Sequence, residues 1–297
     1  MQLNYLDVKN YHIPVYILDK KSDTTLLCLH GLNSSSDFIK PLIEFNNNFN
    51  IVALNFPGSK YFAQTKVDEL TLEWWTEVAK EVLKRIKTKK IVLLAHSMAG
   101  GVAVEIGNDP RIEKIIMLAT INPNMVNTSA YSVLEKIISP INTVNKILGK
   151  TISTISSKFK KTAPLLETFG NQSLWVNLLK SYVLNSEFMK ELDDKYHQLS
   201  SKMIFIVGSK DNIIGTKEFI DYANNLNVNH LIIGTSHSPI KEQPELIMNF
   251  ISHLYNGKKR LFWQKFFILK KHEEKRNINI SENKTDIKFS YEERDIE

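Results

Sequence analysis

Six short runs of apolar residues recur along the chain, and stretches of helical periodicity separate several of them. The runs are continuous, without the alternation of polar and apolar residues that marks a half-exposed strand. They lie at residues 26–29, 51–54, 91–94, 115–118, 203–207 and 231–233. Continuous apolar strands are typical of parallel sheets that helices cover on both faces. The pattern therefore predicts an α/β fold with a mostly parallel, doubly wound sheet.

Two further patterns complete the expected core. Apolar residues between 72 and 86 recur with the i, i+3, i+4 spacing of an amphipathic helix. Residues 243–255 predict a second helix, because Pro244 lies near the start and Gly257 follows the end. Residues 5–18, interrupted near Asn10, predict an antiparallel hairpin at the edge of the sheet.

The alternation of strands and helices stops after Pro123. Residues 124–200 are rich in Ser, Thr, Asn and Lys and contain helical patches, which predicts a helical cap inserted into a core made of 1–123 and 201–256. The insertion leaves the carboxyl end of a strand, where α/β sheets bind ligands. We therefore interpret it as a lid rather than a surface excursion, and we expect its apolar residues, such as Trp175, to shape an acyl pocket.

The net charge of +6 is concentrated near the end of the chain. Residues 257–276 contain eight basic and two acidic residues, so the rest of the chain is neutral overall. A neutral body argues against nucleic-acid binding. Within the terminal segment 257–297, the basic and aromatic residues 258–271 are expected either to pack on the protein or to contact an anionic membrane surface weakly. The residues from Asn277 onward have mixed charge and predict a disordered tail.

Other features of the sequence indicate where the protein works. No apolar run reaches the roughly 18 residues that would span a bilayer. The first residues lack the basic and apolar regions of a secretory signal. A single cysteine, Cys28, excludes an intramolecular disulfide framework and a multi-cysteine metal site. We expect a cytoplasmic protein, with any membrane contact being peripheral.

The segment IVLLAHSMAGG at 91–101 predicts a nucleophile elbow. An apolar strand runs directly into Ser97 and then into a helix rich in small residues. Such a sharp turn exposes the serine at the top of the sheet and needs small residues two positions before and after it. Ala95 and Ala99 nearly meet this steric requirement, although the strict pattern has glycine at both places. The alternative is an ordinary helix-capping serine.

An acid and a histidine follow later strands in the order that such an elbow requires. Asp211 comes just after the run 203–207, and His237 lies in the loop after the run 231–233. Both could reach the same edge of the sheet as Ser97, where Asp211 would fix the tautomer of His237 and His237 would accept the serine proton. The alternatives are a turn aspartate and a solvated loop histidine.

The loop after the run 26–29 supplies the expected donors for an oxyanion. Gly31 at this bend would let the backbone N–H of Leu32 point inward, and Met98, which follows the nucleophile, would supply the second N–H. His30 is expected to support this loop through hydrogen bonds.

Taken together, these segments resemble the α/β-hydrolase superfamily, and especially its carboxylesterases and monoacylglycerol-lipase-like members. The matching segments are LHGLNSSSDF (29–38), NFPGS (55–59), AHSMAGG (95–101), GSKDNI (208–213) and SHSPIKEQPELIMNFI (236–251). The resemblance implies an α/β-hydrolase fold with Ser97 as nucleophile, Asp211 as acid and His237 as base. One departure is Asn55, because many relatives have an aspartate ahead of the Pro-Gly pair.

The predicted function is therefore that of a serine hydrolase which cleaves carboxylic esters of the esterase or lipase type. An acyl-enzyme would form on Ser97, and neither a metal nor an organic cofactor would be needed. The expected partner is a small-molecule ester or lipid-derived substrate. A thioesterase, an acyltransferase or an aminopeptidase could use the same three residues, because a fold does not dictate its substrate. A binding module without catalysis on the same scaffold is a second alternative. A membrane-surface protein that acts through residues 258–271 is a third, and it can coexist with the enzyme.

Overall fold

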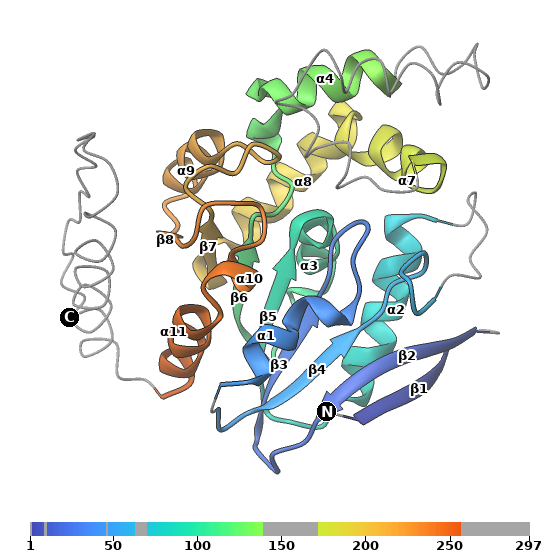
Figure 1. The fold of residues 1–297 in the computed structure, drawn as a ribbon, viewed down its shortest axis with the longest axis vertical. Coiled ribbons are helices and arrows are strands. Elements are labelled where there is room, and N and C mark those ends of the chain that lie inside the picture. The colour runs from blue at the N-terminus through green and yellow to red at the C-terminus, as the bar shows by residue number, and fades with distance from the viewer. Residues whose placement is uncertain (1, 9–10, 46, 63–69, 139–171, 257–297) are drawn as a thin grey trace. The chain divides into compact units, whose positions relative to one another are not determined.

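In a computed structural model the chain forms two compact units, Met1–Asn249 and Phe250–Glu297. The structure describes residues 2–8, 11–45, 47–62, 70–138 and 172–256, so nearly all of the described residues belong to the first unit (Figure 1). The predicted tail 257–297 and part of the predicted cap lie outside the described residues. The predicted boundaries of core, cap and tail therefore stay predictions.

Eight strands form one sheet in the order β1-β2-β4-β3-β5-β6-β7-β8. Neighbouring strands from β4 to β8 pair in parallel, as the continuous apolar runs predict. The first two strands form the antiparallel hairpin at the sheet edge that residues 5–18 predict, and β2 pairs antiparallel with β4. The strands are β1 (Gln2–Val8), β2 (Tyr11–Leu18), β3 (Thr24–Leu29), β4 (Asn50–Leu54), β5 (Lys90–His96), β6 (Ile112–Leu118), β7 (Met203–Val207) and β8 (His230–Ile232).

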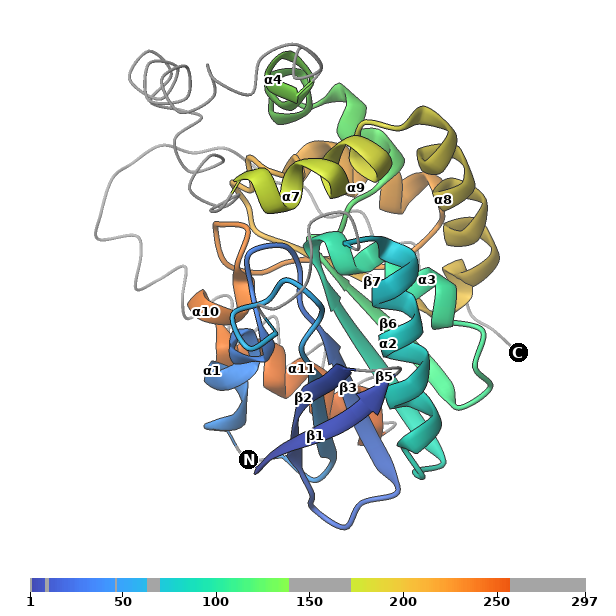
Figure 2. The same cartoon turned by 90° about the vertical axis from the view of Figure 1, so that its right-hand side faces the viewer.

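Helices cover both faces of this sheet: α2 and α3 lie on one face, and α1 and α10 lie on the other (Figure 2). The α-helices are α1 (Lys40–Ile43), α2 (Leu72–Arg85), α3 (Gly100–Ile106), α4 (Ser129–Ile138), α7 (Gln172–Leu178), α8 (Ser186–Leu199), α9 (Thr216–Asn225), α10 (Pro239–Glu242) and α11 (Pro244–Asn256). Short 3-10 turns are η1 (Ser36–Ile39), η3 (Ser97–Ala99), η4 (Pro123–Asn127) and η7 (Ser200–Lys202), and η6 (Leu179–Val183) is a π-helical turn. None of the described helices is long and apolar enough to cross a membrane.

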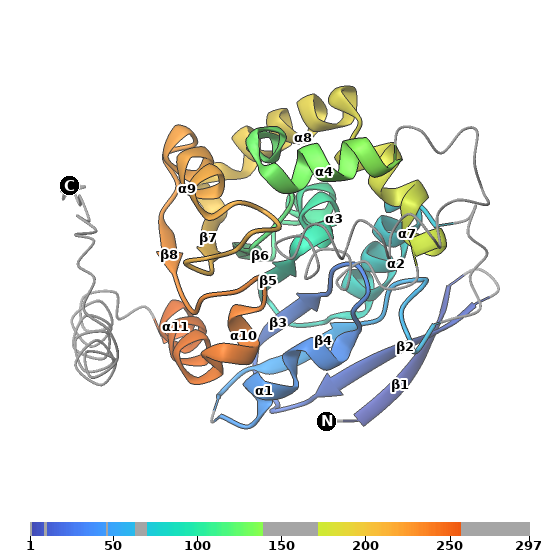
Figure 3. The ribbon, with the colours of Figure 1, turned by 45° about the horizontal axis from the view of Figure 1, so that its top comes forward.

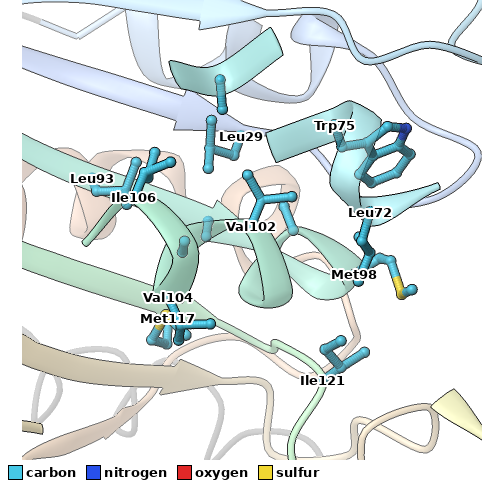
Figure 4. Packing of buried hydrophobic residues seen from close by; sticks show 14 of the residues in the cluster. Leu29, Leu72, Trp75, Leu93, Met98, Val102, Val104, Ile106, Met117 and Ile121 are labelled. Atoms are coloured by element: carbon cyan, nitrogen blue, oxygen red, sulfur yellow. The ribbon is translucent and has the colours of Figure 1, made fainter. Parts of the chain in front are cut away.

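Local sequence explains where the long helix α2 begins and why it packs as it does. The Thr71 side chain accepts a hydrogen bond from the Trp74 backbone N–H, which caps the start of the helix. The apolar stripe of α2 is buried, including Trp75, which is fully covered. Figure 4 shows the buried cluster beside α2, which includes Leu29 and Leu93 of the sheet and Val102 of α3. This packing fixes the carboxyl ends of β3 and β5 relative to each other.

The described helices of the insertion lie beyond the carboxyl ends of the central strands (Figure 3). Polar side chains tie them to the core. The Tyr182 hydroxyl in η6 accepts a bond from the Leu72 N–H at the start of α2 (3.0 Å) and donates to Glu73. The Tyr196 hydroxyl in α8 donates to the Ile121 carbonyl (2.7 Å). These helices are therefore anchored to the core at several points.

Trp175 does not shape a pocket at the predicted active site. It is 2% exposed and packs edge-on against Trp75, with 6.3 Å between the ring centroids. The expectation that this side chain contacts an acyl chain is therefore wrong, because the tryptophan fills core volume instead.

Trp175→Ala should lower the free energy of unfolding by about 3–5 kcal/mol, because it leaves a cavity in packed core. Denaturant unfolding would measure the loss. The matched control is Val126→Ala, which truncates an exposed apolar residue of the same insertion and should change stability by less than about 0.5 kcal/mol. Unchanged stability in the Trp175 variant, together with an altered chain-length preference, would restore the original interpretation.

Candidate active site

Ser97 lies at the sharp turn between β5 and α3, as the elbow pattern predicts. Its φ of 55° is in the left-handed region, which non-glycine residues seldom adopt. Ala95 and Ala99 are fully buried on either side, so the small residues at these positions are required by space. The Ser97 carbonyl accepts a hydrogen bond from the Ile121 N–H (3.1 Å), which helps to hold the turn after β6 against the elbow.

The structure brings Ser97, His237 and Asp211 into one chain of hydrogen bonds. The distance from Ser97 Oγ to His237 Nε2 is 3.0 Å, and that from His237 Nδ1 to Asp211 Oδ2 is 2.8 Å. Because a carboxylate only accepts, Nδ1 carries the proton and Nε2 is left to accept from the serine hydroxyl. This tautomer is the one that a general base needs. The catalytic role of each residue stays a prediction.

Asp211 is held in its charged form although it is buried. Burial alone would raise the pKa of this carboxyl, but the adjacent His237 and the backbone N–H groups of Ile214 and Ile213 together lower it. Those two N–H groups donate to Oδ1 at 3.1 and 2.9 Å, which leaves Oδ2 for the histidine. The carboxylate therefore has a fixed orientation and a dedicated partner for each oxygen.

Two side chains outside this chain of hydrogen bonds hold the loop that carries His237. His96 Nε2 donates to the His237 carbonyl (2.8 Å). The Glu242 carboxylate accepts from the backbone N–H of Ser236 (2.9 Å) and from both the N–H and the hydroxyl of Thr235. His96, which directly precedes Ser97, is thus tied to the main chain of His237.

The loop after β3 is fixed by His30, which is fully buried. Its Nδ1 donates to the Gly31 carbonyl (2.7 Å) and its Nε2 accepts from the Phe56 N–H (2.9 Å). Asn55 adds two further bonds, since it accepts from the Ser36 N–H (2.8 Å) and donates to the Pro14 carbonyl (2.9 Å). An aspartate could accept but could not donate, so the amide satisfies both neighbours at this position.

Gly31 approaches Ser97 more closely than any other residue type could. A Cβ atom built on it would lie 2.7 Å from Ser97 Cβ and 3.2 Å from Ser97 Oγ. Leu32 follows and lines the cavity in front of the serine, while Met98 is the first residue after the nucleophile. The backbone N–H groups of Leu32 and Met98 stay predicted oxyanion donors.

Two histidines, the fully buried His30 and the partly buried His96, make stability depend on pH. Burial lowers the pKa of His30 from 6.5 to about 4 and that of His96 to about 3. A proton on His30 Nε2 would face the Phe56 N–H, and one on His96 Nδ1 would meet no acceptor in the described part of the chain. Between pH 6.5 and about 4 the unfolded chain therefore binds more protons than the folded one.

Lowering the pH from 7 to 5 should therefore lower the free energy of unfolding by about 2 kcal/mol for each of these two histidines. The stabilisation is complete above pH 6.5 and declines as the pH falls through that value. Urea titrations at both pH values would measure it. His30→Gln keeps an acceptor but cannot titrate, so it should remove roughly half of the decline. An equal decline in the variant and the wild type would contradict this assignment.

A cavity of about 250 Å³ opens in front of Ser97. Its wall contains apolar side chains, the two residues of the serine–histidine pair and one cation. The lining residues are Leu32, Asn33, Ser34, Phe38, His96, Ser97, Leu118, Ile213, His237, Ser238, Ile240 and Lys241. None of them belongs to the described part of the insertion, so the loops after β3, β6, β7 and β8 shape this space. The sequence patterns missed Phe38, Ile240 and Lys241 because nothing in their spacing marks them as neighbours.

A larger cavity of about 630 Å³ lies between the β1–β2 hairpin and the last turn of α2. It includes Thr25 and Asn50, which lie at the start of β3 and β4. It therefore lies at the amino ends of the parallel strands, opposite the edge where such sheets bind ligands. The described residues contain no cluster of three or more His, Cys, Asp or Glu side chains that could hold a metal ion.

Comparison with known proteins gives consistent similarities. A family model described as "alpha/beta hydrolase fold" matches residues 24–139. "Putative esterase/lipase 2" of Mycoplasma pneumoniae is 25% identical over 243 residues, which cover 78% of this chain and 89% of that protein. "Putative esterase/lipase 1" of Mycoplasma genitalium is 23% identical over 235 residues, with 70% and 82% covered.

Solved structures show the same fold. A thermophilic esterase from Thermogutta terrifontis is similar with a TM-score of 0.58 and 18% identity, over 86% of this chain and 99% of that chain. The eight-stranded, mostly parallel sheet and the matched family model indicate the same fold. The chain has the α/β-hydrolase fold.

Proposed function

We propose that this α/β-hydrolase cleaves carboxylic esters, with Ser97 as the nucleophile. The observation that supports this most directly is the hydrogen-bonded chain from Ser97 Oγ through His237 to the buried Asp211. A neutral histidine with its free nitrogen facing a serine hydroxyl can accept that proton as the oxygen attacks. Two relatives that are named as esterase/lipase proteins support an ester rather than an amide as the substrate.

The reaction follows from this geometry in two halves. Ser97 Oγ attacks the ester carbonyl while its proton passes to His237 Nε2, and the backbone N–H groups of Leu32 and Met98 stabilise the oxyanion. His237 then gives that proton to the departing alcohol, which leaves an acyl-enzyme on Ser97. In the second half a water molecule loses a proton to His237 and attacks the acyl carbon. Collapse of this intermediate releases the carboxylic acid, and the proton returns to Ser97.

The size of the site favours small acyl groups. A space of about 250 Å³ corresponds to roughly eight water-sized groups, which is at the small end for ligand sites. Leu118 at the end of β6 and Ile213 in the loop after β7 supply apolar walls. We therefore propose short-chain esters as the preferred substrates.

A fluorophosphonate probe and a substrate panel test this proposal together. The probe should label the wild-type protein and leave Ser97→Ala unlabelled. The panel compares p-nitrophenyl esters of two to twelve carbons with matched thioesters and aminoacyl amides, with kcat/KM as the readout. Labelling without ester turnover, but with thioester or amide turnover, would replace the esterase by one of the other reaction types. No labelling at all would remove the nucleophile assignment.

A further inference from the structure

A second cavity of about 320 Å³ adjoins the one in front of Ser97. The two share part of their walls, namely Asn33, Ser34, Phe38 and Lys241. Beyond the reacting groups, apolar and polar residues line the first cavity in similar measure, and its apolar wall includes Leu118 and Ile213. The second adds Ser35, Asp37 and Lys60 and is therefore polar. A molecule held at Ser97 through an apolar part could extend a polar part into the second cavity.

The charges around the second cavity leave a positive excess. Lys60 and Lys40 both form ion pairs with Asp37, and the Tyr61 hydroxyl donates to the same carboxylate at 2.8 Å. Burial by itself would raise the pKa of Asp37, but Lys60, Lys40 and Tyr61 together lower it to about 2, so it stays charged. Its charge is thus already matched by two lysines.

Lys241 differs from these lysines because it has no ion pair among the described residues. It is exposed, and it lines both cavities. The nearest acid along the chain, Glu242, is already engaged by Thr235 and Ser236. A lysine that lines the same cavity as Ser97 and has no ion pair among the described residues can bind an anion carried by the ligand.

The position of Lys241 also indicates which half of an ester would carry the anion. Lys241 lies four residues after His237, in the short helix α10 that continues the same loop. His237 gives its proton to the departing alcohol in the proposed reaction, so the alcohol lies on the His237 side of the reacting carbon. The apolar residues Leu118 and Ile213 come from β6 and the loop after β7, and they remain for the acyl group.

We propose that the preferred substrates are short-chain esters whose alcohol carries an anionic group, a carboxylate or a phosphate, and that Lys241 binds this group. The inference rests on the proposed ester hydrolysis and adds a substrate class to it. Asn33 and Ser34, which line both cavities, supply further polar contacts along the path. Lysine suits either anion, because its ammonium acts as a point charge rather than as a bidentate fork.

The experiment compares three butyrate esters of one phenol framework. They are 4-butyryloxybenzoate, its neutral benzamide counterpart and the corresponding benzylphosphonate. Because the phenols differ in acidity, the readout is how each kcat/KM changes between the wild type and Lys241→Met. The anionic esters should lose about tenfold more than the neutral amide, mainly through KM, and high salt should shrink the difference. Of the two anionic esters, the one whose kcat/KM falls further in Lys241→Met shows whether Lys241 prefers a carboxylate or a phosphate.

Lys80→Met is the matched control, since it removes an exposed lysine of α2 that lines neither cavity. It should leave the ratio of anionic to neutral turnover unchanged. Equal losses for charged and neutral esters in the Lys241 variant would overturn the proposal, as would the same selective loss in the Lys80 variant. A charge preference seen only with phenyl hemiglutarate, whose anion is on the acyl side, would overturn the assignment to the alcohol. Turnover of the neutral ester by the wild type shows that ester hydrolysis stands even where the charge preference fails.

Discussion

Ser97→Ala should lower kcat for a good ester substrate by about 10³-fold or more and leave only what binding and the oxyanion donors supply. His237→Ala should be about as damaging, because a serine hydroxyl without a base is a weak nucleophile at neutral pH. Asp211→Asn should lower kcat by as much or by less, because it removes control over the tautomer of His237. The double variant Ser97→Ala/His237→Ala should be little worse than either single one, since the residues act as a unit.

Steady-state kinetics on folded, purified samples would measure these losses. Ser209→Ala and His197→Ala are suitable controls, because both remove an exposed side chain of the same type and should keep near-normal kcat. If the two single losses in kcat multiply in the double variant, Ser97 and His237 do not act as a unit. Near-full esterase activity in His237→Ala would mean that another histidine is the base. His96 is a poor substitute, since burial lowers its pKa to about 3 and its Nε2 already donates to a carbonyl.

Gly31→Ala should lower kcat by about 10²-fold or more while the protein stays folded. The added methyl group would lie 2.7 Å from Ser97 Cβ and 3.0 Å from the His96 carbonyl, so the elbow or the loop after β3 must shift. A displacement of the order of 1 Å in a reacting group can cost about this much in rate. The measurement is kcat per mole of active site, together with a denaturation curve.

Gly107→Ala is the matched control for this crowding. Its added methyl group would lie 2.7 Å from Leu199 Cδ1 and 2.8 Å from Ile115 Cδ1, in packed core at the end of α3. It should lower stability and keep kcat close to normal. A Gly31→Ala protein that retains kcat within about threefold would mean that the elbow relaxes freely, so the close approach would not set the position of the nucleophile.

Most of the sheet could be predicted from the sequence, because strands buried on both faces are marked by apolar content alone. The run 203–207 coincides with β7, and the interruption near Asn10 falls between the end of β1 at Val8 and the start of β2 at Tyr11. The order β2-β4-β3-β5 could not be read in this way, since apolar runs carry no information about which strand lies beside which.

The candidate site could also be predicted only in part, and for the same physical reason. Ser97, Asp211 and His237 each follow a strand that the pattern marks, so their meeting at one sheet edge could be expected before any coordinates. The cavity walls depend on side-chain packing between distant loops, as the contribution of Lys241 illustrates. The burial of Trp175 was missed for the same reason, because a large apolar residue in a polar segment fits either a ligand wall or a core contact.

The hydrogen bond from His96 reaches the carbonyl of residue 237 and not its imidazole. The loop is thus held through its main chain, by His96 from one side and by Glu242 through Thr235 and Ser236 from the other. These main-chain bonds do not involve the imidazole of His237, so replacing that side chain would not remove them. Position 237 is therefore a place where the chemistry of the site could be exchanged, by evolution or by an engineer, without rebuilding the scaffold around it.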